Sequence, residues 1–512
     1  MKVGSTKAGL KDGLEIYEKL KDLELDETKV ADVESLILKR DVGIFHLKKG
    51  KIYLAKSVLD KVTGAIFIGD GTFEFSPPTQ IERYQLEKFT QKKSLDQRFS
   101  ELYLRFTDKT KEELEGKLKF IRGEIEGKAK GIKEKGDKRS LKLLGRNINA
   151  RVLEDLLFEG SNIGRADSYC GFFYAEIYTK SYDRFFFYFE PKDIEEVRLW
   201  HEYFKPGERE ADTLCSFHKE NDYSAFGGKD GEPIENEEDK DEIKAKSYRM
   251  VVRLESNGNM DASCELAFVP LVEGIRVISF ELDTALKVSQ VENGEDSSFS
   301  ELSFIREKDQ NELTVILPHP LQAGKEKKLL FRYSGKIMDR TWYGDFFIKE
   351  TTWWFPRYGY FPKTTFDLTF KTPKDYKFVS VGKKEKEWTQ GDTLFSHWVE
   401  DFPTSFVSFN FGSFQIYTQK SEDLPEVEVY FAETAHRKFN QDNTEYMVPK
   451  GAHFKENIAA DVLNSLNSFQ KSFGEYPFDY ITATEIPAFY GQSFPGFLHL
   501  GWLTFQEEEK FK

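Results

Sequence analysis

The spacing of apolar residues predicts a short helical start followed by many short strands. In residues 1–39 the apolar positions recur as they do on one face of a helix, and we interpret this segment as two short helices. These positions are Leu10, Leu14, Tyr17, Val30, Val33 and Ile37. From residue 43 the pattern changes to the alternation that is typical of strands. Gly69-Asp70-Gly71 separates two such runs and indicates a hairpin turn, because these residues adopt positive φ readily.

Residues 40–218 are predicted to form a β-rich accessory domain with a helical insertion. The insertion is the charged, partly helical stretch 84–145, in which 130–138 is either a solvated loop or a frayed helix. Residues 219–246 are acidic and poor in apolar residues, which predicts a flexible linker. A calcium-binding loop is excluded there, because the carboxylates lack the alternate-position spacing and the final Glu of such loops.

The second half of the chain is predicted to form two further domains. Residues 247–420 contain strands at intervals of about ten residues, the pattern of an antiparallel sandwich or saddle. In residues 421–512 the apolar spacing becomes helical after Ala452, the helix ends at Phe473-Gly474, and a strand follows. The predicted fold class is therefore mainly β with helical parts, or α+β.

Composition supports a strand-rich protein of several domains. The chain has 512 residues, of which 15% are aromatic and 47 are Phe, and these residues favour strands. The net charge of −14 argues against binding to nucleic acid or anionic membranes, because contacts to phosphate need clustered Lys and Arg. The acidity serves either solubility or the attraction of cationic substrates, and solubility is the simpler explanation.

Cys170, Cys215 and Cys264 are too few for a disulfide framework, although one pair could form. Cys215 and His218 have the spacing of metal ligands, but no second ligand pair accompanies them, so we expect no structural zinc. No apolar stretch is long enough to span a membrane, and the first residues lack the apolar core of a signal peptide. The protein is therefore expected to be cytoplasmic, or a mature exported form with an added Met.

The segment from Ser472 to Phe505 carries the most informative motifs. A Phe-Gly-x-Tyr-Pro turn at 473–477 leads into a strand, then Pro-x-Phe at 487–489, then a Gly-containing segment at 490–496. This order resembles the start of the catalytic domain in the membrane alanyl aminopeptidase family of zinc peptidases, which are gluzincins. The resemblance implies that residues 421–512 begin a thermolysin-like catalytic domain.

Earlier motifs resemble the N-terminal β-domain of the same family. They are Leu317-Pro318-His319-Pro320-Leu321 with Gly324 and Tyr333-Ser334-Gly335, then Trp354-Phe355-Pro356, then Phe402-Pro403-Thr404-Ser405. Together with the C-terminal motifs they cover roughly the second half of the chain in the family's order. Residues 1–240 have no counterpart in the well-known members and resemble the accessory part of bacterial outliers.

The resemblance implies a zinc cofactor for the full-length parent protein. The family binds zinc through a helical His-Glu-x-x-His motif and a later Glu, and the zinc activates water to attack a peptide carbonyl. His201-Glu202 begins like this motif, but Lys205 ends it, and we expect a surface turn there. The other His residues stand alone. We therefore predict no catalytic and no metal-binding residue within 1–512, with the chain ending before the motif.

The substrate-binding strand of the family corresponds to Tyr490, Gly491, Gln492, Ser493 and Phe494. In the family this strand pairs with the peptide substrate as an added β-strand, and its Glu binds the free amino terminus. That Glu is missing here. Gln492 could accept a hydrogen bond from an ammonium but has no charge, and Glu485 is either a substitute or an ordinary strand position. The alternative interpretation of the segment is a buried Gly/Pro-rich turn.

Two functional hypotheses follow. The first is the N-terminal part of an aminopeptidase-like zinc peptidase acting on peptides, with this chain inactive by itself. The alternative is a non-catalytic binding or scaffold protein derived from that family. Because zinc-bearing helices would normally cover the last strand, we expect disorder or self-association through Phe494, Phe497, Leu498, Leu500, Trp502 and Phe505. The aromatic residues near Pro356, namely Trp342, Trp353, Trp354 and Tyr358, are expected to be core.

Overall fold

The computed structural model describes most of the chain. The described residues are 6–143, 146–160, 171–179, 184–205, 208–219, 240–295, 298–340, 345–348, 353–359, 362–422, 424–432, 454–488, 490–501 and 504. They form a mainly β protein with helices, the α+β class that the sequence predicts. Among these residues no helix has both the length and the apolar character that a membrane span needs.

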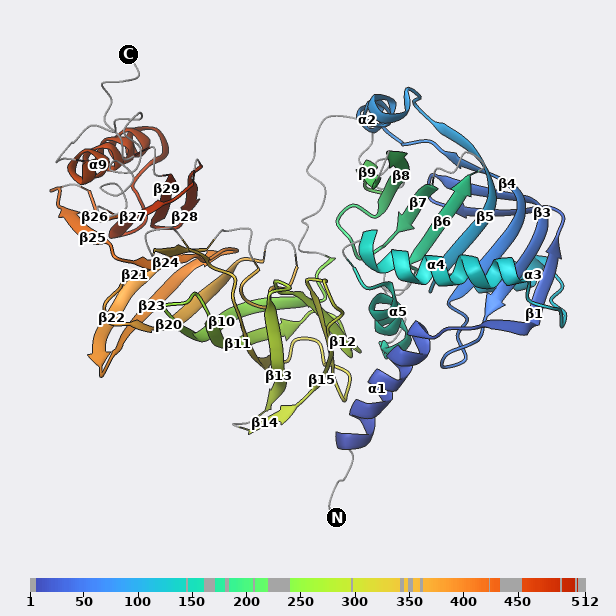
Figure 1. Ribbon diagram of the computed structural model, residues 1–512, viewed down its shortest axis with the longest axis horizontal. Coiled ribbons are helices and arrows are strands. Elements are labelled where there is room, and N and C mark those ends of the chain that lie inside the picture. Colours follow the sequence, from blue (N-terminus) through green and yellow to red (C-terminus); the bar gives the residue numbers. More distant parts are fainter. Residues whose placement is uncertain are drawn as a thin grey trace. The chain divides into compact units, whose positions relative to one another are not determined.

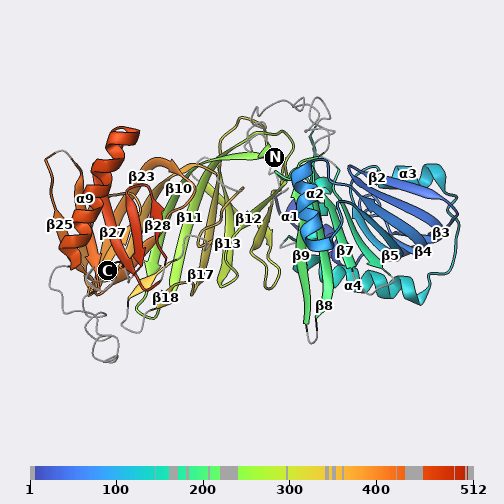
Figure 2. The same cartoon turned by 90° about the horizontal axis from the view of Figure 1, so that it is seen from above.

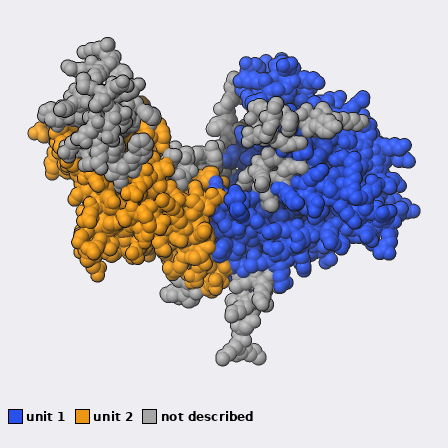
Figure 3. Space-filling view, viewed as in Figure 1, with its two compact units in different colours: residues 1–243, 270–279, 303–325 blue, residues 244–269, 280–302, 326–512 orange. Residues whose placement is uncertain are grey.

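The chain forms two compact units, which Figure 3 shows in blue and orange. Unit 1 contains residues 1–243, 270–279 and 303–325, and unit 2 contains residues 244–269, 280–302 and 326–512. The chain thus returns twice to unit 1, which the predicted succession of domains does not include. Most of the predicted linker, 220–239, lies outside the described residues, and a strand already begins at Ile243.

Unit 1 contains one large antiparallel sheet, coloured blue to green in Figure 1. The strand order is β1-β3-β4-β5-β6-β7-β8-β9, and β2 pairs with β3, so most neighbours are also consecutive in sequence. The strands are β1 Leu25–Val33, β2 Leu36–Arg40, β3 Gly43–Ala55, β4 Gly64–Phe75, β5 Leu95–Phe106, β6 Phe173–Thr179, β7 Arg184–Phe189, β8 Val197–Lys205 and β9 Glu208–Phe217.

Both faces of this sheet are buried, because successive side chains of a strand point to opposite sides. One face is rich in Phe, including Phe67 and Phe173, and is closed by Leu86 and Leu114 from two helices. The other face is rich in Tyr and packs against helical residues such as Tyr17. The helices of unit 1 are α1 Thr6–Lys21, α2 Gln80–Thr90, α3 Thr110–Lys117, α4 Gly127–Leu143 and α5 Ile148–Leu157.

The predicted second helix of residues 1–39 is wrong, because this segment forms β1 and most of β2. Leu36 and Leu38 are buried whereas Ile37 between them is 49% exposed, so the burial has the period of a strand. Both strands pair with β3, and this pairing outweighs the helical spacing of the apolar residues. In the charged insertion, by contrast, residues 130–138 form part of α4, which agrees with the helical alternative.

The predicted hairpin turn at Gly69-Asp70-Gly71 is also wrong, because β4 continues through these residues. The register shifts there by one residue against β3 and by one against β5, as in a β-bulge. A Cβ on Gly69 would lie 2.2 Å from the carbonyl oxygen of Lys49. The glycine therefore permits close approach of two backbones instead of reversing the chain.

The segments that return to unit 1 carry most of a small sheet of order β12-β16-β15, in which β15 and β16 are antiparallel. Its residues Val277, Ile305 and Ile316 belong to the same core cluster as helix α1 and helix α5. Asn147 caps α5 by accepting hydrogen bonds from the N–H groups of Asn149 and Ala150. The strands are β12 Val277–Glu281, β15 Ser303–Ile305 and β16 Glu312–Ile316.

Unit 2 contains an eight-stranded sheet of order β14-β13-β17-β11-β10-β20-β23-β22, in agreement with the strands predicted for 247–420. β10 pairs with β20 in parallel, whereas β13 with β14, β13 with β17, β11 with β17, β20 with β23 and β22 with β23 pair antiparallel. The strands are β10 Ile243–Leu254, β11 Met260–Pro270, β13 Leu286–Glu295, β14 Ser298–Glu301, β17 Lys327–Gly335, β20 Thr364–Pro373, β22 Lys383–Gln390 and β23 Thr393–Thr404.

A four-stranded sheet of order β18-β19-β24-β21 lies beside the predicted aromatic core. Trp354 is 1% exposed, and its indole N–H donates to the carbonyl oxygen of Val407 at 2.8 Å, as a core tryptophan should. Trp353 and Tyr358 are half-buried, and Trp342 lies outside the described residues. The strands are β18 Asp339–Arg340, β19 Phe346–Phe347, β21 Lys377–Ser380 and β24 Phe409–Gly412.

The last part of unit 2 is a five-stranded sheet with helix α9 Phe454–Phe473 along it (Figure 2). Ile458, Ala459 and Leu463 of α9 pack on Val427 and Ala483 of the sheet. Gly474, with φ of 95°, follows the helix, as the sequence predicts. The strands are β25 Gln415–Gln419, β26 Glu426–Phe431, β27 Tyr480–Ile486, β28 Gln492–Phe494 and β29 Phe497–Gly501.

Candidate functional site

The residues expected to bind substrate lie at one edge of the five-stranded sheet. Its order is β25-β26-β27-β29-β28, so within the described part of the chain β28 pairs only with β29. Tyr490, Gly491 and Ser493 are exposed, Gln492 is half-buried and Phe494 is buried. The segment is therefore an edge strand, and the Pro-Gly turn comes after it.

A two-residue turn joins β28 to β29. Phe494 pairs with Phe497, which leaves Pro495 and Gly496 as the turn. Gly496 has φ of 63°, and Pro-Gly suits the two central positions of a type II turn. A Cβ on Gly496 would lie 2.3 Å from the ring of Tyr480, so the turn packs closely on β27.

No described strand pairs with the outer edge of β28, so this edge offers main-chain groups to an added strand. In an antiparallel hairpin the pair next to a two-residue turn is hydrogen-bonded, and every second residue turns its N–H and C=O away from the partner strand. In β28 the residue that faces the free edge is Ser493. An extended peptide can therefore pair with this strand through the main chain of Ser493.

Phe494 and Phe497 are 8% and 1% exposed, so the expectation that they are uncovered is wrong. Their rings pack against each other and against His499, with centroids 5.0 to 5.9 Å apart. On the opposite face, Leu498 and Leu500 are partly buried against the cluster beneath α9. Trp502 and Phe505 lie outside the described residues.

His499 fixes the side chain of Gln492 across the hairpin. Its Nδ1 lies 3.0 Å from Gln492 Oε1, and the two residues are register partners. Burial lowers the pKa of His499 to about 3, so the imidazole is neutral. In the sequence His499 stands alone, with no second ligand or catalytic residue at a recognisable spacing. The signal that connects it to Gln492 is the Pro-Gly turn, from which the pairing of the strands can be counted.

Glu485 occupies an ordinary strand position in β27 and does not reach the edge. Its side chain is buried, and Oε2 accepts a hydrogen bond from the N–H of Ala432 at 2.9 Å. It is near the buried Asp345, whose pKa is raised to about 6 by burial and, to a lesser extent, by the charge of Glu485. Glu485 therefore does not replace a substrate-binding carboxylate at β28.

The remaining motif residues have structural partners. His201 and Glu202 lie within β8, not in a surface turn. His201 stacks on Phe185 with ring centroids 4.6 Å apart, and Glu202 pairs with Arg184 at 3.0 Å. Burial raises the pKa of the Cys215 thiol to about 12. The described residues contain no group of three or more His, Cys, Asp or Glu that could hold a metal ion.

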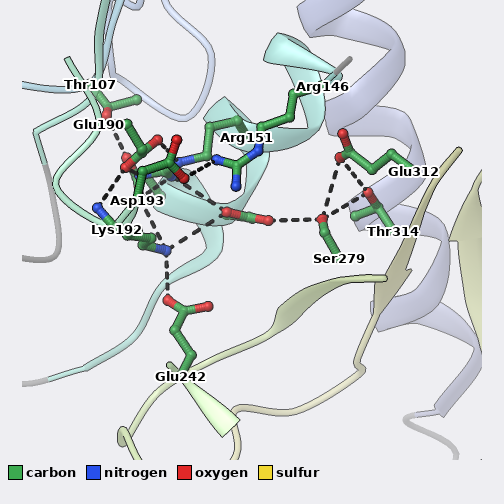
Figure 4. Close-up of polar contacts among 12 residues, drawn as sticks. Thr107, Arg146, Arg151, Glu190, Lys192, Asp193, Glu242, Ser279, Glu312 and Thr314 are labelled. Atoms are coloured by element: carbon green, nitrogen blue, oxygen red, sulfur yellow. Dashed lines mark hydrogen bonds and ion pairs between the residues drawn. The ribbon is translucent and has the colours of Figure 1, made fainter. Parts of the chain in front are cut away.

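A buried ionic cluster surrounds α5 in unit 1 (Figure 4). Arg151 contacts Asp155 at 2.6 Å and Glu190 at 2.5 Å, and Lys192 contacts Glu242 at 2.6 Å. Burial acts to raise the pKa of Glu190, but the charge and hydrogen bonds of Arg151 outweigh it and lower the pKa to about 2. These contacts connect α5 with the link after β7 and with the residue just before β10.

The same cluster extends to the three-stranded sheet through Glu154 and Glu312. Ser279 donates to Glu154 Oε1 at 2.9 Å and lies 3.4 Å from Glu312 Oε1. Burial raises the pKa of Glu154 to about 7 and also raises the pKa of Glu312. A displaced pKa can mark a reactive group. Here the polar groups mostly satisfy one another, so we interpret the cluster as a structural link.

A pocket of about 270 Å³ is lined by residues of the eight-stranded sheet of unit 2, and each of its two cations contacts a carboxylate. Lys328 contacts Glu265 at 2.9 Å, and Arg249 contacts Asp367 at 3.4 Å. The edge strand β28 therefore remains the better candidate site.

No protein-family model matches the chain, and no curated protein matches it. Among solved structures, the M1 zinc metallopeptidase from Deinococcus radiodurans is similar at 13% identity, covering 52% of this chain and 62% of that protein, with a TM-score of 0.41. A mutant of it bound to a Tyr-Ser-Ala substrate is similar at 13% identity, covering 51% and 60%, with a TM-score of 0.41.

A two-domain M1 zinc metallopeptidase mutant bound to L-arginine is similar at 12% identity, covering 51% of this chain and 60% of that protein, with a TM-score of 0.41. The chain thus spans 60% to 62% of the length of these neighbours. Similarity at this level transfers no residue role to the chain.

Proposed function

We propose that this chain is part of a zinc peptidase related to the alanyl aminopeptidases and that β28 aligns an extended peptide substrate. The observation that carries the proposal is the edge position of β28, at the place in the motif order where a substrate-binding strand is expected. Zinc and a general base would come from residues that this sequence does not contain. The chain's own part is to hold the peptide by main-chain hydrogen bonds.

Proline at residue 493 tests this role of the main chain. Ser493→Pro removes the N–H that faces the free edge, and an edge strand tolerates proline because that N–H has no partner within the sheet. We expect Ser493→Pro to abolish binding of the peptide Ala-Ala-Tyr-Ala-Ala-Ala, measured by fluorescence anisotropy with a dye at the peptide's carboxyl end. Ser493→Ala keeps the N–H and should bind like the wild type.

Hydrogen exchange of the same samples gives a second readout. Peptide binding should slow exchange of the amides in residues 490–501 of the wild type and of Ser493→Ala. Equal binding by Ser493→Pro, or no slowing in this segment, would refute the proposed role of β28. We also expect no aminoacyl-nitroanilide hydrolysis by the 512-residue chain with added zinc. Robust, chelator-sensitive hydrolysis would contradict the assignment of the metal to residues outside this sequence.

A further inference from the structure

The orientation of the Gln492 amide follows from the buried His499. His499 is fully buried and neutral, so its ring carries one N–H and one lone pair. Nδ1 contacts Gln492, and the buried Nε2 has no hydrogen-bond partner among the described residues. One nitrogen of this ring is therefore left unpaired, whichever way the Gln492 amide is turned.

The preferred orientation of the Gln492 amide is the one whose unpaired buried atom costs less free energy. If the Gln492 nitrogen donated to Nδ1, the unpaired Nε2 would carry a buried N–H, and orphaned buried N–H groups are rare in proteins. If Nδ1 donates to Gln492 Oε1, the unpaired atom is only a lone pair. The second arrangement is the one in the structure. It turns the amide nitrogen of Gln492, with its two N–H groups, away from His499.

Among the described residues, the strands at this edge offer no exposed carboxylate to a free amino terminus. In strands β27, β28 and β29 the only carboxylate is Glu485, which is 6% exposed and accepts a hydrogen bond from Ala432. The polar side chain on β28 that a hydrogen bond holds in place is Gln492, and its free amide nitrogen carries donors. Donors match the carbonyl oxygens of a peptide and repel an ammonium group.

We propose that the edge of β28 takes an internal or amino-blocked stretch of extended peptide, and not a free amino terminus. The proposal rests on the proposed function of β28 and adds its substrate class. Ser493 pairs with the peptide main chain, and the Gln492 amide donates to a peptide carbonyl. His499 is the positioning residue that holds the amide in this orientation. A peptidase built on this edge would cut within chains or act on blocked peptides.

Two forms of one peptide test the proposal. Ala-Ala-Tyr-Ala-Ala-Ala is compared with its N-acetylated form at pH 6, where the free α-amine is charged because its pKa is about 8. We expect the acetylated form to bind the wild-type chain at least about threefold more tightly. Tighter binding of the free-amine form would overturn the inference. If the peptides bind but Ser493→Pro leaves both affinities unchanged, the proposed function itself fails.

Variants of the two residues sharpen the test. Gln492→Glu supplies the missing carboxylate and should reverse the preference, with a gain of about tenfold for the free amine. Gln419→Glu on β25, the opposite edge of the same sheet, is the matched control and should leave the preference unchanged. His499→Phe fits the aromatic surroundings and frees the amide, so the ratio of the two affinities should approach one. An unchanged ratio in His499→Phe would exclude the positioning role.

Discussion

At the scale of single residues, the ionic cluster around α5 holds more carboxylates than cations. Arg151 and Lys192 lie 3.5 and 3.7 Å from Glu154, but Asp155, Glu190 and Glu242 compete for the same two cations. The negative charge of Glu154 is therefore poorly compensated by cations. Burial raises the pKa of Glu154 to about 7, so the carboxyl group keeps its proton in more acidic solution. Folding is then linked to proton uptake at this carboxyl group.

Glu154→Gln should remove a decline of stability with rising pH. A carboxyl group whose pKa is raised on folding stabilises the protein fully below its unfolded pKa of about 4.5, and this contribution is lost as pH rises through about 7. From about 1.4 kcal/mol per pKa unit, Glu154 should account for up to about 3 kcal/mol of decline between pH 5 and pH 8. Urea unfolding at pH 5 and at pH 8, monitored by hydrogen exchange of the amides in α5, measures this difference.

The control is Glu159→Gln, which neutralises a carboxylate whose side chain is 51% exposed. Its decline between pH 5 and pH 8 should equal that of the wild type. An equal decline in Glu154→Gln would show that Glu154 does not carry the proton.

Single-residue chemistry at the candidate site is only partly predictable from the sequence. The exposed positions Tyr490, Gly491 and Ser493 follow from a strand that is recognised by its motif order. The partner of Gln492 does not follow in this way, because His499 belongs to the next strand and looks like any isolated histidine. Only the two-residue turn at Pro495-Gly496 sets the register that joins them.

At the scale of elements, the two glycines inside α4 have opposite surroundings. A Cβ on Gly131 would meet no atom within 4 Å, whereas a Cβ on Gly136 would lie 2.4 Å from the ring of Tyr103. Glycine within a helix is less favourable than alanine by about 0.5–1 kcal/mol. Gly131 therefore weakens α4 without a packing reason, and Gly136 permits α4 to approach β5.

Alanine substitutions should separate these two roles. Gly131→Ala should stabilise unit 1 by about 0.5–1 kcal/mol, because the methyl group enters open space. Gly136→Ala should destabilise it by about 1–3 kcal/mol, because the methyl group must displace a buried ring. Thermal unfolding and hydrogen exchange of α4 measure both effects. A stabilising Gly136→Ala would contradict the contact with Tyr103.

Elements with a clear apolar period and clear turn residues are predictable from the sequence. Elements whose structure depends on pairing with a distant strand are not. The strands of 247–420, helix α9 and β27 follow from periodicity and turn residues alone. The spacing of apolar residues at 25–40 fits a helix as well as two strands, and pairing with β3 decides for strands. Likewise, Gly69 and Gly71 suit either a turn or a bulge, and the long partner strands β3 and β5 select the bulge.

At the scale of the whole molecule, the two units are interleaved along the chain. Residues 270–279 and 303–325 return to unit 1 between strands that belong to unit 2. The sequence predicts one domain for all of 247–420, because periodicity identifies a strand but not the sheet that the strand joins. What assigns β16 to unit 1 is a non-local contact, since Ile316 packs at Gly13 of α1.

Substitutions that create a cavity in each of two strands consecutive in the sequence, β16 and β17, test whether the two units are interleaved in this way. Ile316 of β16 and Leu329 of β17 are both fully buried, but Ile316 belongs to unit 1 and Leu329 to unit 2. Ile316→Ala and Leu329→Ala should each cost about 2–5 kcal/mol of stability. Hydrogen exchange should accelerate in α1 and α5 for Ile316→Ala, and in β11 and β13 for Leu329→Ala, because each cavity weakens only the core that it enters. If Ile316→Ala accelerated hydrogen exchange in β11 and left exchange in α1 unchanged, β16 would belong to the same unit as β17, as the order of the sequence suggests.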